Sequence, residues 1–122
     1  MKRIKIVLHF VVIPIFYCGC VQPESTVSAN GGNNPPVIES VVLDPFVINV
    51  GTTATIKVNA YDPDGDMLTY KWSSALGDII GSGSQVRYTA AFCCVGSNNI
   101  TVVVSDTRGG KVTEDVRIEI NP

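Results

Sequence analysis

Histidine is almost absent from this sequence, and charged residues are few. The only histidine among 122 residues is His9, which lies in an N-terminal apolar stretch, and charged residues make up 16%. A segment without histidine cannot form a Ser-His-Asp or Cys-His catalytic set, nor a zinc site that uses imidazole. We therefore expect the chain beyond that stretch to be non-catalytic.

The first nineteen residues have the pattern of a secretory signal peptide. Three basic residues among the first five precede an apolar run over residues 6–17. A membrane-spanning helix needs about 20 predominantly apolar residues, and this run is shorter. We predict a signal peptide over residues 1–19 and export of the remainder.

Loss of the signal peptide would make the chain more acidic. Six basic residues would then face eleven acidic ones. Nucleic acids and anionic membrane faces require clustered cations. We therefore expect no nucleic-acid partner.

The end of the signal region resembles the lipobox of bacterial lipoproteins, in which a small residue precedes the cysteine that is acylated. Gly19 and Cys20 fit this pattern, whereas Tyr17 and Cys18 stand where the family favours Leu, and Ala or Ser. Cys18 is not an acceptor by this logic, because a bulky residue precedes it. The resemblance implies covalent lipid (palmitate) on Cys20 and a membrane anchor in the bacterial cell envelope, with plain secretion as the alternative. Val21 replaces the aspartate that retains such lipoproteins at the inner membrane, which favours the outer membrane.

A polar segment follows the proposed anchor. Residues 20–34 are rich in Gly, Ser and Asn and have no periodic apolar face, which predicts a flexible tether. As a flexible coil, about 14 residues span roughly 20 Å. The tether would keep the folded domain, expected over residues 35–122, near the membrane.

Short segments of alternating polarity fill the remaining sequence, and none has a helical period. Seven strands are expected, over residues 37–43, 53–61, 67–73, 79–80, 86–88, 100–105 and 112–120. This pattern predicts an all-β fold, an antiparallel immunoglobulin-like β-sandwich of about seven strands. Within the first strand the apolar positions change parity between Ile38 and Val41, which predicts either a bulge or an edge strand that switches sheets. Glu114 shares the parity of an apolar face, so we expect it near a strand end or a bulge, and we expect Trp72 at the centre of the core.

Several motifs together resemble a PKD-type domain, one of the immunoglobulin-like and cadherin-like sandwiches of extracellular bacterial proteins. They are residues 34–37, Gly51-Thr52, Asp62-Pro63-Asp64-Gly65-Asp66, residues 68–72, residues 88–90, and residues 100–106 with Gly109-Gly110. Residues 73–78 depart from the family pattern of Asp-Phe-Gly-Asp-Gly, which leaves the subfamily open. The resemblance implies a binding or spacer module outside the cytoplasm that contacts protein or carbohydrate. The alternative is a structural subunit that self-associates through its sheet edges.

The acidic turn at residues 62–66 has two interpretations. Such Asp/Pro/Gly sequences most often form only a tight turn, in which the carboxylates accept backbone N–H groups. Three carboxylates on one loop also suit calcium, although the spacing excludes an EF-hand. Some PKD-type domains bind calcium at one pole of the sandwich, and the resemblance carries the ligands over to Asn34, Asp62, Asp64 and Asp106, with Asp66 pointing away.

Two adjacent cysteines, Cys93 and Cys94, lie in a segment expected to be exported to an oxidising compartment. We predict a vicinal disulfide between them, and free thiols or pairing between molecules are the alternatives. The small ring of a vicinal disulfide distorts its peptide and makes the bond easier to reduce. The pair lacks the Cys-x-x-Cys spacing of redox catalysts.

Overall fold

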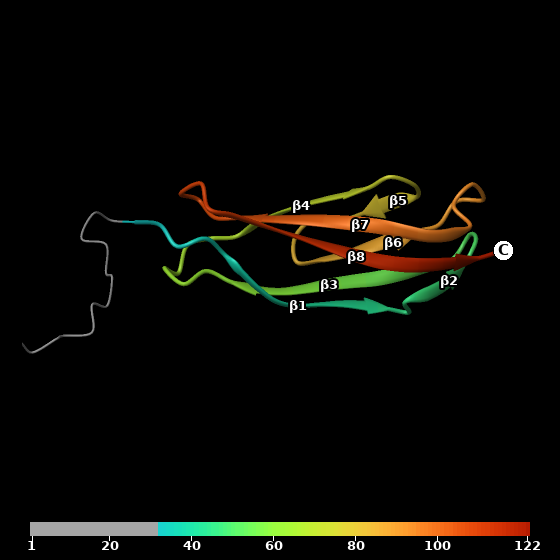
Figure 1. Cartoon of the computed structure of the whole chain (residues 1–122), viewed down its shortest axis with the longest axis horizontal. Coiled ribbons are helices and arrows are strands. Elements are labelled where there is room, and N and C mark those ends of the chain that lie inside the picture. The colour runs from blue at the N-terminus through green and yellow to red at the C-terminus, as the bar shows by residue number, and fades with distance from the viewer. Residues whose placement is uncertain (1–31) are drawn as a thin grey trace, which may run out of the picture.

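The computed structural model describes residues 32–122, which form two stacked β-sheets (Figure 1). The strands are β1 (Val37–Asp44), β2 (Val47–Asn49), β3 (Thr53–Tyr61), β4 (Thr69–Ser74), β5 (Asp78–Ile80), β6 (Gln85–Thr89), β7 (Gly96–Ser105) and β8 (Lys111–Asn121). One sheet has the order β1-β3-β6-β5 and the other β2-β8-β7-β4. The predicted β-sandwich is confirmed.

The number of strands and one strand pairing differ from the expectation. The described residues form eight strands, because residues 47–49, where no strand was expected, form the short strand β2. This strand pairs with β8 in parallel, whereas the other pairs are antiparallel. The chain passes from β1, at the edge of one sheet, to β2, at the edge of the other. A strand of three residues is too short to show a periodic pattern.

Part of the chain is outside this description. The predicted signal peptide, the predicted lipidation site Cys20 and the expected tether up to residue 31 lie outside the described residues. Within residues 32–122, no helix is long and apolar enough to cross a membrane.

The parity change in the first strand is a bulge, the first of the two expected alternatives. In the pairing of β1 with β3, the register shifts between Ile38 and Ser40. Because Glu39 is an extra residue in β1, Ile38 and Val41 both pack against buried hydrophobic residues between the sheets. The bulge also interrupts the outer edge of β1.

The core is centred on Tyr88 rather than on Trp72. Tyr88 is the largest fully buried side chain, and it packs with Ile56, Ile100 and Ile118. Trp72 is only half-buried, because it lies on the edge strand β4, and it packs against both groups of buried core residues. Its indole Nε1 donates a hydrogen bond to the carbonyl of Gly83 at 2.9 Å.

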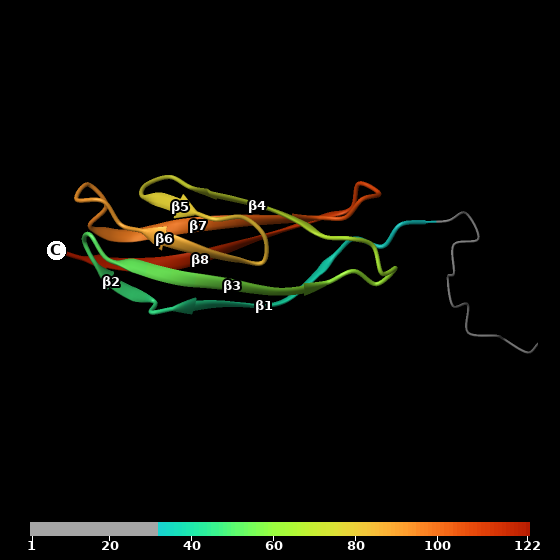
Figure 2. The ribbon, with the colours of Figure 1, turned by 180° about the vertical axis from the view of Figure 1, so that it is seen from behind.

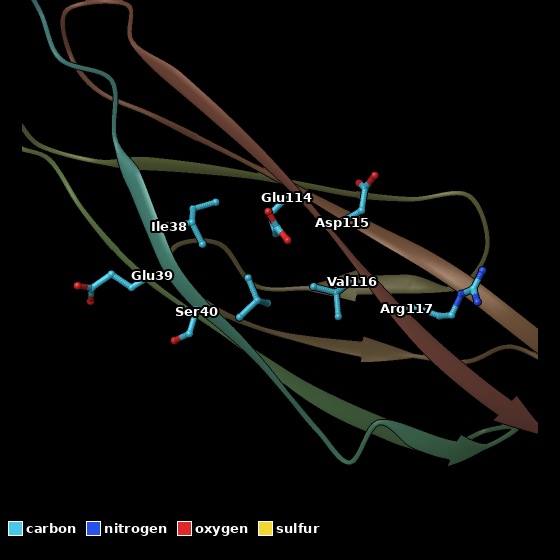
Figure 3. Close-up of a pocket in the computed structure, with 8 residues that line it drawn as sticks. Ile38, Glu39, Ser40, Glu114, Asp115, Val116 and Arg117 are labelled. Atoms are coloured by element: carbon cyan, nitrogen blue, oxygen red, sulfur yellow. The ribbon is translucent and has the colours of Figure 1, made fainter.

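Glu114 lies within β8 and not at a strand end or bulge, because the pairing of β7 with β8 runs without interruption through it. Its side chain is exposed although it faces the core side, since a hollow of about 350 Å³ opens there between β1 and β8. Figure 3 shows Ile38 and Val116 pointing into this hollow, with Glu114 between the two strands and Arg117 turned away.

The sandwich has two distinct poles. The β3–β4 and β7–β8 turns lie at the same end as the start of β1, as both Figure 1 and Figure 2 show. The loop between β6 and β7 and the C-terminal residue lie at the other end. We call these the N-terminal pole and the far pole.

Candidate functional site

The acidic turn between β3 and β4 folds around the carboxylate of Asp62. Its Oδ1 accepts hydrogen bonds from the backbone N–H groups of Asp64 at 2.8 Å and Asp66 at 3.1 Å. Gly65 has a φ of 79°, which lets the chain reverse without a steric penalty from a side chain. The turn therefore brings the side chains of Asp62 and Asp66 to the same side.

A third carboxylate joins this pair from the β7–β8 turn. One oxygen from each of Asp62, Asp66 and Asp106 lies within 4.8 Å of the others. Asp106 is buried, with 7% of its surface exposed. Its Oδ1 accepts hydrogen bonds from the backbone of Arg108 at 2.7 Å and Gly110 at 2.8 Å, which fixes its position.

Asn33 completes the cluster from the segment that precedes β1. Its Nδ2 donates a hydrogen bond to Oδ2 of Asp106 at 2.6 Å. Burial alone would raise the pKa of Asp106, but hydrogen bonds from Asn33 and from the backbone of Gly110, Arg108 and Gly109 outweigh it and lower that pKa below the ordinary value. The carboxylate is therefore held in its ionised form.

Three oxygen atoms of this cluster are buried and accept no hydrogen bond. They are Oδ1 of Asn33, Oδ2 of Asp62 and Oδ2 of Asp66. Asp66 forms an ion pair with Arg108, whose Nη1 lies 3.9 Å from Oδ2 of Asp66. A buried oxygen without a donor costs about 1–3 kcal/mol, and three at one place favour a bound cation.

Asp64 and Asn34 lie outside this cluster and contact each other. Asp64 accepts hydrogen bonds from the backbone N–H of Asn34 at 2.7 Å and from its Nδ2 at 3.0 Å. These bonds, the backbone one first, lower the pKa of Asp64 below the ordinary value. The pair attaches the segment before β1 to the acidic turn.

The structure thus brings together only part of the ligand set carried over from the PKD resemblance. Asp62 and Asp106 meet, whereas Asp64 and Asn34 form their own contact and Asp66 and Asn33 take the inner positions. The signal for Asp66 was present in its spacing from Asp62. An aspartate that accepts N–H groups two and four residues ahead turns the fourth residue back toward itself.

Gly110 permits the close approach of the three segments. A Cβ there would collide with the Asp106 carboxylate and would lie 2.8 Å from Nδ2 of Asn33 and 2.9 Å from Cα of Pro35. Real Cβ atoms essentially never approach other atoms so closely. The glycine is therefore required by packing rather than by its backbone conformation.

The adjacent cysteines lie at the far pole. Both are thiols in this structure, with their sulfur atoms 3.3 Å apart. Cys93 is exposed, whereas Cys94 is fully buried in the hydrophobic core that contains Tyr88. The predicted disulfide between them stays a prediction.

The two-sheet topology defines an immunoglobulin-like β-sandwich domain. The chain belongs to the family of bacterial Ig domains, whose sequence pattern matches residues 33–119. Such domains are typically extracellular and generally non-catalytic. A search of curated proteins found no match.

Solved structures with the same fold share little sequence with this chain. A nucleoside hydrolase-related hypothetical protein from Saccharophagus degradans, associated with carbohydrate metabolism, has a TM-score of 0.61 at 21% identity. The match covers 74% of this chain but only 26% of that one. The PKD1 domain of Vibrio anguillarum Epp has a TM-score of 0.53 at 19% identity, with 74% of this chain and 100% of that one covered. These likenesses establish the fold alone.

Proposed function

We propose that this chain is a calcium-stabilised, non-catalytic module that binds or spaces other molecules outside the cytoplasm. The observation that carries the proposal is the set of three buried oxygens of Asn33, Asp62 and Asp66 that accept no hydrogen bond, beside ionised Asp106. Together with Asp106, these residues come from three separate segments of the chain. One cation would hold these segments together.

Calcium suits this oxygen set better than a softer metal. It takes 6–8 oxygen ligands, amide carbonyls included, at about 2.3–2.6 Å, so ligands on opposite sides of one ion are about 4.6–5.2 Å apart. One oxygen of each of the three carboxylates lies within 4.8 Å of the other two, which is close enough for all three to contact one such ion. The cluster holds no sulfur or imidazole ligand that would favour zinc.

The position of the cluster suggests what calcium would do. Asn33 and Asn34 lie at the end of the expected tether, and both form hydrogen bonds with aspartates of the N-terminal pole. A cation bound to Asn33 would fix the direction in which the domain leaves its tether. We propose that a lipid on Cys20 anchors that tether, with the outer membrane as the favoured location, and that the module contacts protein or carbohydrate.

Thermal melting of the full chain, with millimolar calcium and with EDTA, tests the cation site. Calcium at about 100 times its dissociation constant stabilises the fold by about 2.7 kcal/mol, which raises the melting temperature of a domain of this size by roughly 10–20 °C. Asp66→Asn should abolish most of this shift, because it removes an inner charge while Asp62 still holds the turn.

Asp64→Asn is the matched control, since Asp64 lies in the same turn but contacts Asn34 instead of the cluster. It should keep most of the calcium shift. If the wild-type chain melts at the same temperature in both buffers, the calcium site does not exist. If the two variants lose the shift equally, the cluster has been assigned to the wrong residues.

A further inference from the structure

The loop between β6 and β7 has no part in the proposed calcium site, which lies at the opposite pole. It exposes Phe92, Cys93 and Val95 to solvent, with Phe92 exposed to 89%. Cys94, between Cys93 and Val95, is completely buried. One sulfur is therefore open to reagents from solution, and a second lies directly behind it.

The buried sulfur is held in place by its backbone contacts. The N–H of Cys94 donates to the carbonyl of Ala91 at 3.0 Å, which closes a turn. The carbonyl of Cys94 accepts a hydrogen bond from Nδ2 of Asn98 at 2.9 Å. The same Nδ2 lies 3.5 Å from the hydroxyl of Tyr88, which itself donates to the carbonyl of Leu76 at 2.8 Å. These contacts keep the Cys94 sulfur 3.3 Å from that of Cys93.

We propose that Cys93 and Cys94 form a thiol–disulfide exchange site for small aliphatic disulfides, in which Cys93 reacts first and Cys94 second. The Cys93 thiolate attacks a disulfide RSSR, forms a mixed disulfide Cys93–S–S–R and releases one thiolate RS⁻. The Cys94 thiolate then attacks the sulfur of Cys93, closes the Cys93–Cys94 disulfide and releases the second RS⁻. RSSR is reduced to two thiols, and the cysteine pair is oxidised.

The order of the two steps follows from exposure and distance. A small disulfide can reach Cys93, but it cannot reach Cys94 without opening of the core. Once Cys93 carries R, the neighbouring Cys94 attacks within the same molecule, so the second step is favoured over a second external attack. The strain of the small ring makes the product easy to reduce, so the exchange is reversible.

The hydrogen bond between the two sulfurs sets the pH dependence of the first step. That bond, followed by burial and by the negative charge of Cys94, raises the pKa of Cys93 above the ordinary value for a thiol. The thiolate is the attacking species, so the exchange rate should increase with pH through and beyond the range where an ordinary exposed thiol titrates.

Peptide mapping of the reduced full chain after treatment with oxidised glutathione tests this site. Trypsin cleaves after Arg87 and Arg108, so one peptide carries both Cys93 and Cys94 and is separate from Cys18 and Cys20. In the wild type, this peptide should lose two hydrogen atoms and carry no glutathione. In Cys94→Ser and Cys94→Ala it should carry one glutathione, on Cys93; the alanine variant is included because serine places a hydroxyl in the apolar core.

Cys93→Ser provides the decisive comparison. Its remaining thiol, Cys94, should react roughly tenfold or more slowly in the native protein, because reaction requires local opening, and at an ordinary rate in denaturant. The proposal is overturned if native Cys93→Ser reacts as fast as Cys94→Ala. It is also overturned if the wild-type peptide stays reduced, or collects glutathione on both cysteines.

Discussion

At the residue scale, the carboxylate of Asp106 connects two segments of the chain at the N-terminal pole. Its two oxygens accept hydrogen bonds from the β7–β8 turn and from Asn33, so one ionised side chain joins the turn to the segment before β1. Only ionised Asp106 accepts all of these bonds without conflict. Its protonation should therefore loosen both segments.

The lowered pKa of Asp106 predicts how stability depends on pH. Its pKa in the fold is below the ordinary value of 3.8, which it has in the unfolded chain. The ionised form therefore contributes stability above that value, and the contribution is lost as pH falls through the folded pKa. In calcium-free buffer, wild type should melt well above Asp106→Asn at pH 6, and the two melting temperatures should converge as the pH approaches 2. A constant difference between them over this range would contradict the assigned role.

The choice of Asp66 over Asp64 marks what sequence reasoning could and could not reach. The residue types and the place of the acidic turn follow from residues 62–66 alone. Which aspartate faces inward depends on the hydrogen bonds from the N–H groups of Asp64 and Asp66 to Asp62, and on Asn34, which lies thirty positions before Asp64. A contact at that sequence distance has no local signal.

At the element scale, the edge strand β1 and the part of β8 that does not pair with β2 oppose strand addition. β1 carries a bulge at Glu39, and the first half of β8 carries Glu114 on its core-facing side, beside the hollow of Figure 3. Bulges and inward-pointing charges are two devices by which proteins protect exposed sheet edges. A strand that docked here would bury the Glu114 carboxylate, which costs several kcal/mol if it is unpaired.

Replacement of Glu114 by valine should therefore promote self-association. The change removes the buried-charge penalty and adds an apolar side chain beside Ile38 and Val116. We expect dimers to form at concentrations about tenfold lower or less than in wild type, which corresponds to about 1.4 kcal/mol. Sedimentation equilibrium measures this, with Thr113→Val as the control that adds the same side chain at the preceding, exposed position of β8. Equal association of the two variants would show that Glu114 does not protect the edge.

The same elements show where a periodic pattern succeeds. Strict alternation over residues 53–61 locates β3, alternation over residues 100–105 locates the second part of β7, which begins at Gly96, and the parity change in β1 locates its bulge. Periodicity did not predict the exposure of Glu114, because that depends on the gap between strands from different sheets. It also missed β2, whose three residues are too few for a period.

At the scale of the whole molecule, the two candidate sites lie at opposite ends. The ten residues of β7 separate the cysteine loop from Asp106, a length of roughly 30 Å at 3.3 Å per residue. The N-terminal pole is the one that is joined to the expected tether. The β6–β7 loop with its two cysteines and the C-terminal residue lie at the far pole, away from the tether. If the chain is anchored at Cys20, the exposed thiol is the site presented to the surroundings.

This orientation depends on lipidation of Cys20, which can be tested in bacterial cells grown with alkyne palmitate. We expect label on the wild-type chain and on Cys18→Ser, but none on Cys20→Ser, because only Cys20 follows a small residue. The labelled proteins should stay with the membrane fraction, because an acyl chain adds membrane affinity. An unlabelled wild type beside a labelled control lipoprotein would favour plain secretion, and the far pole would then have no fixed orientation toward any membrane.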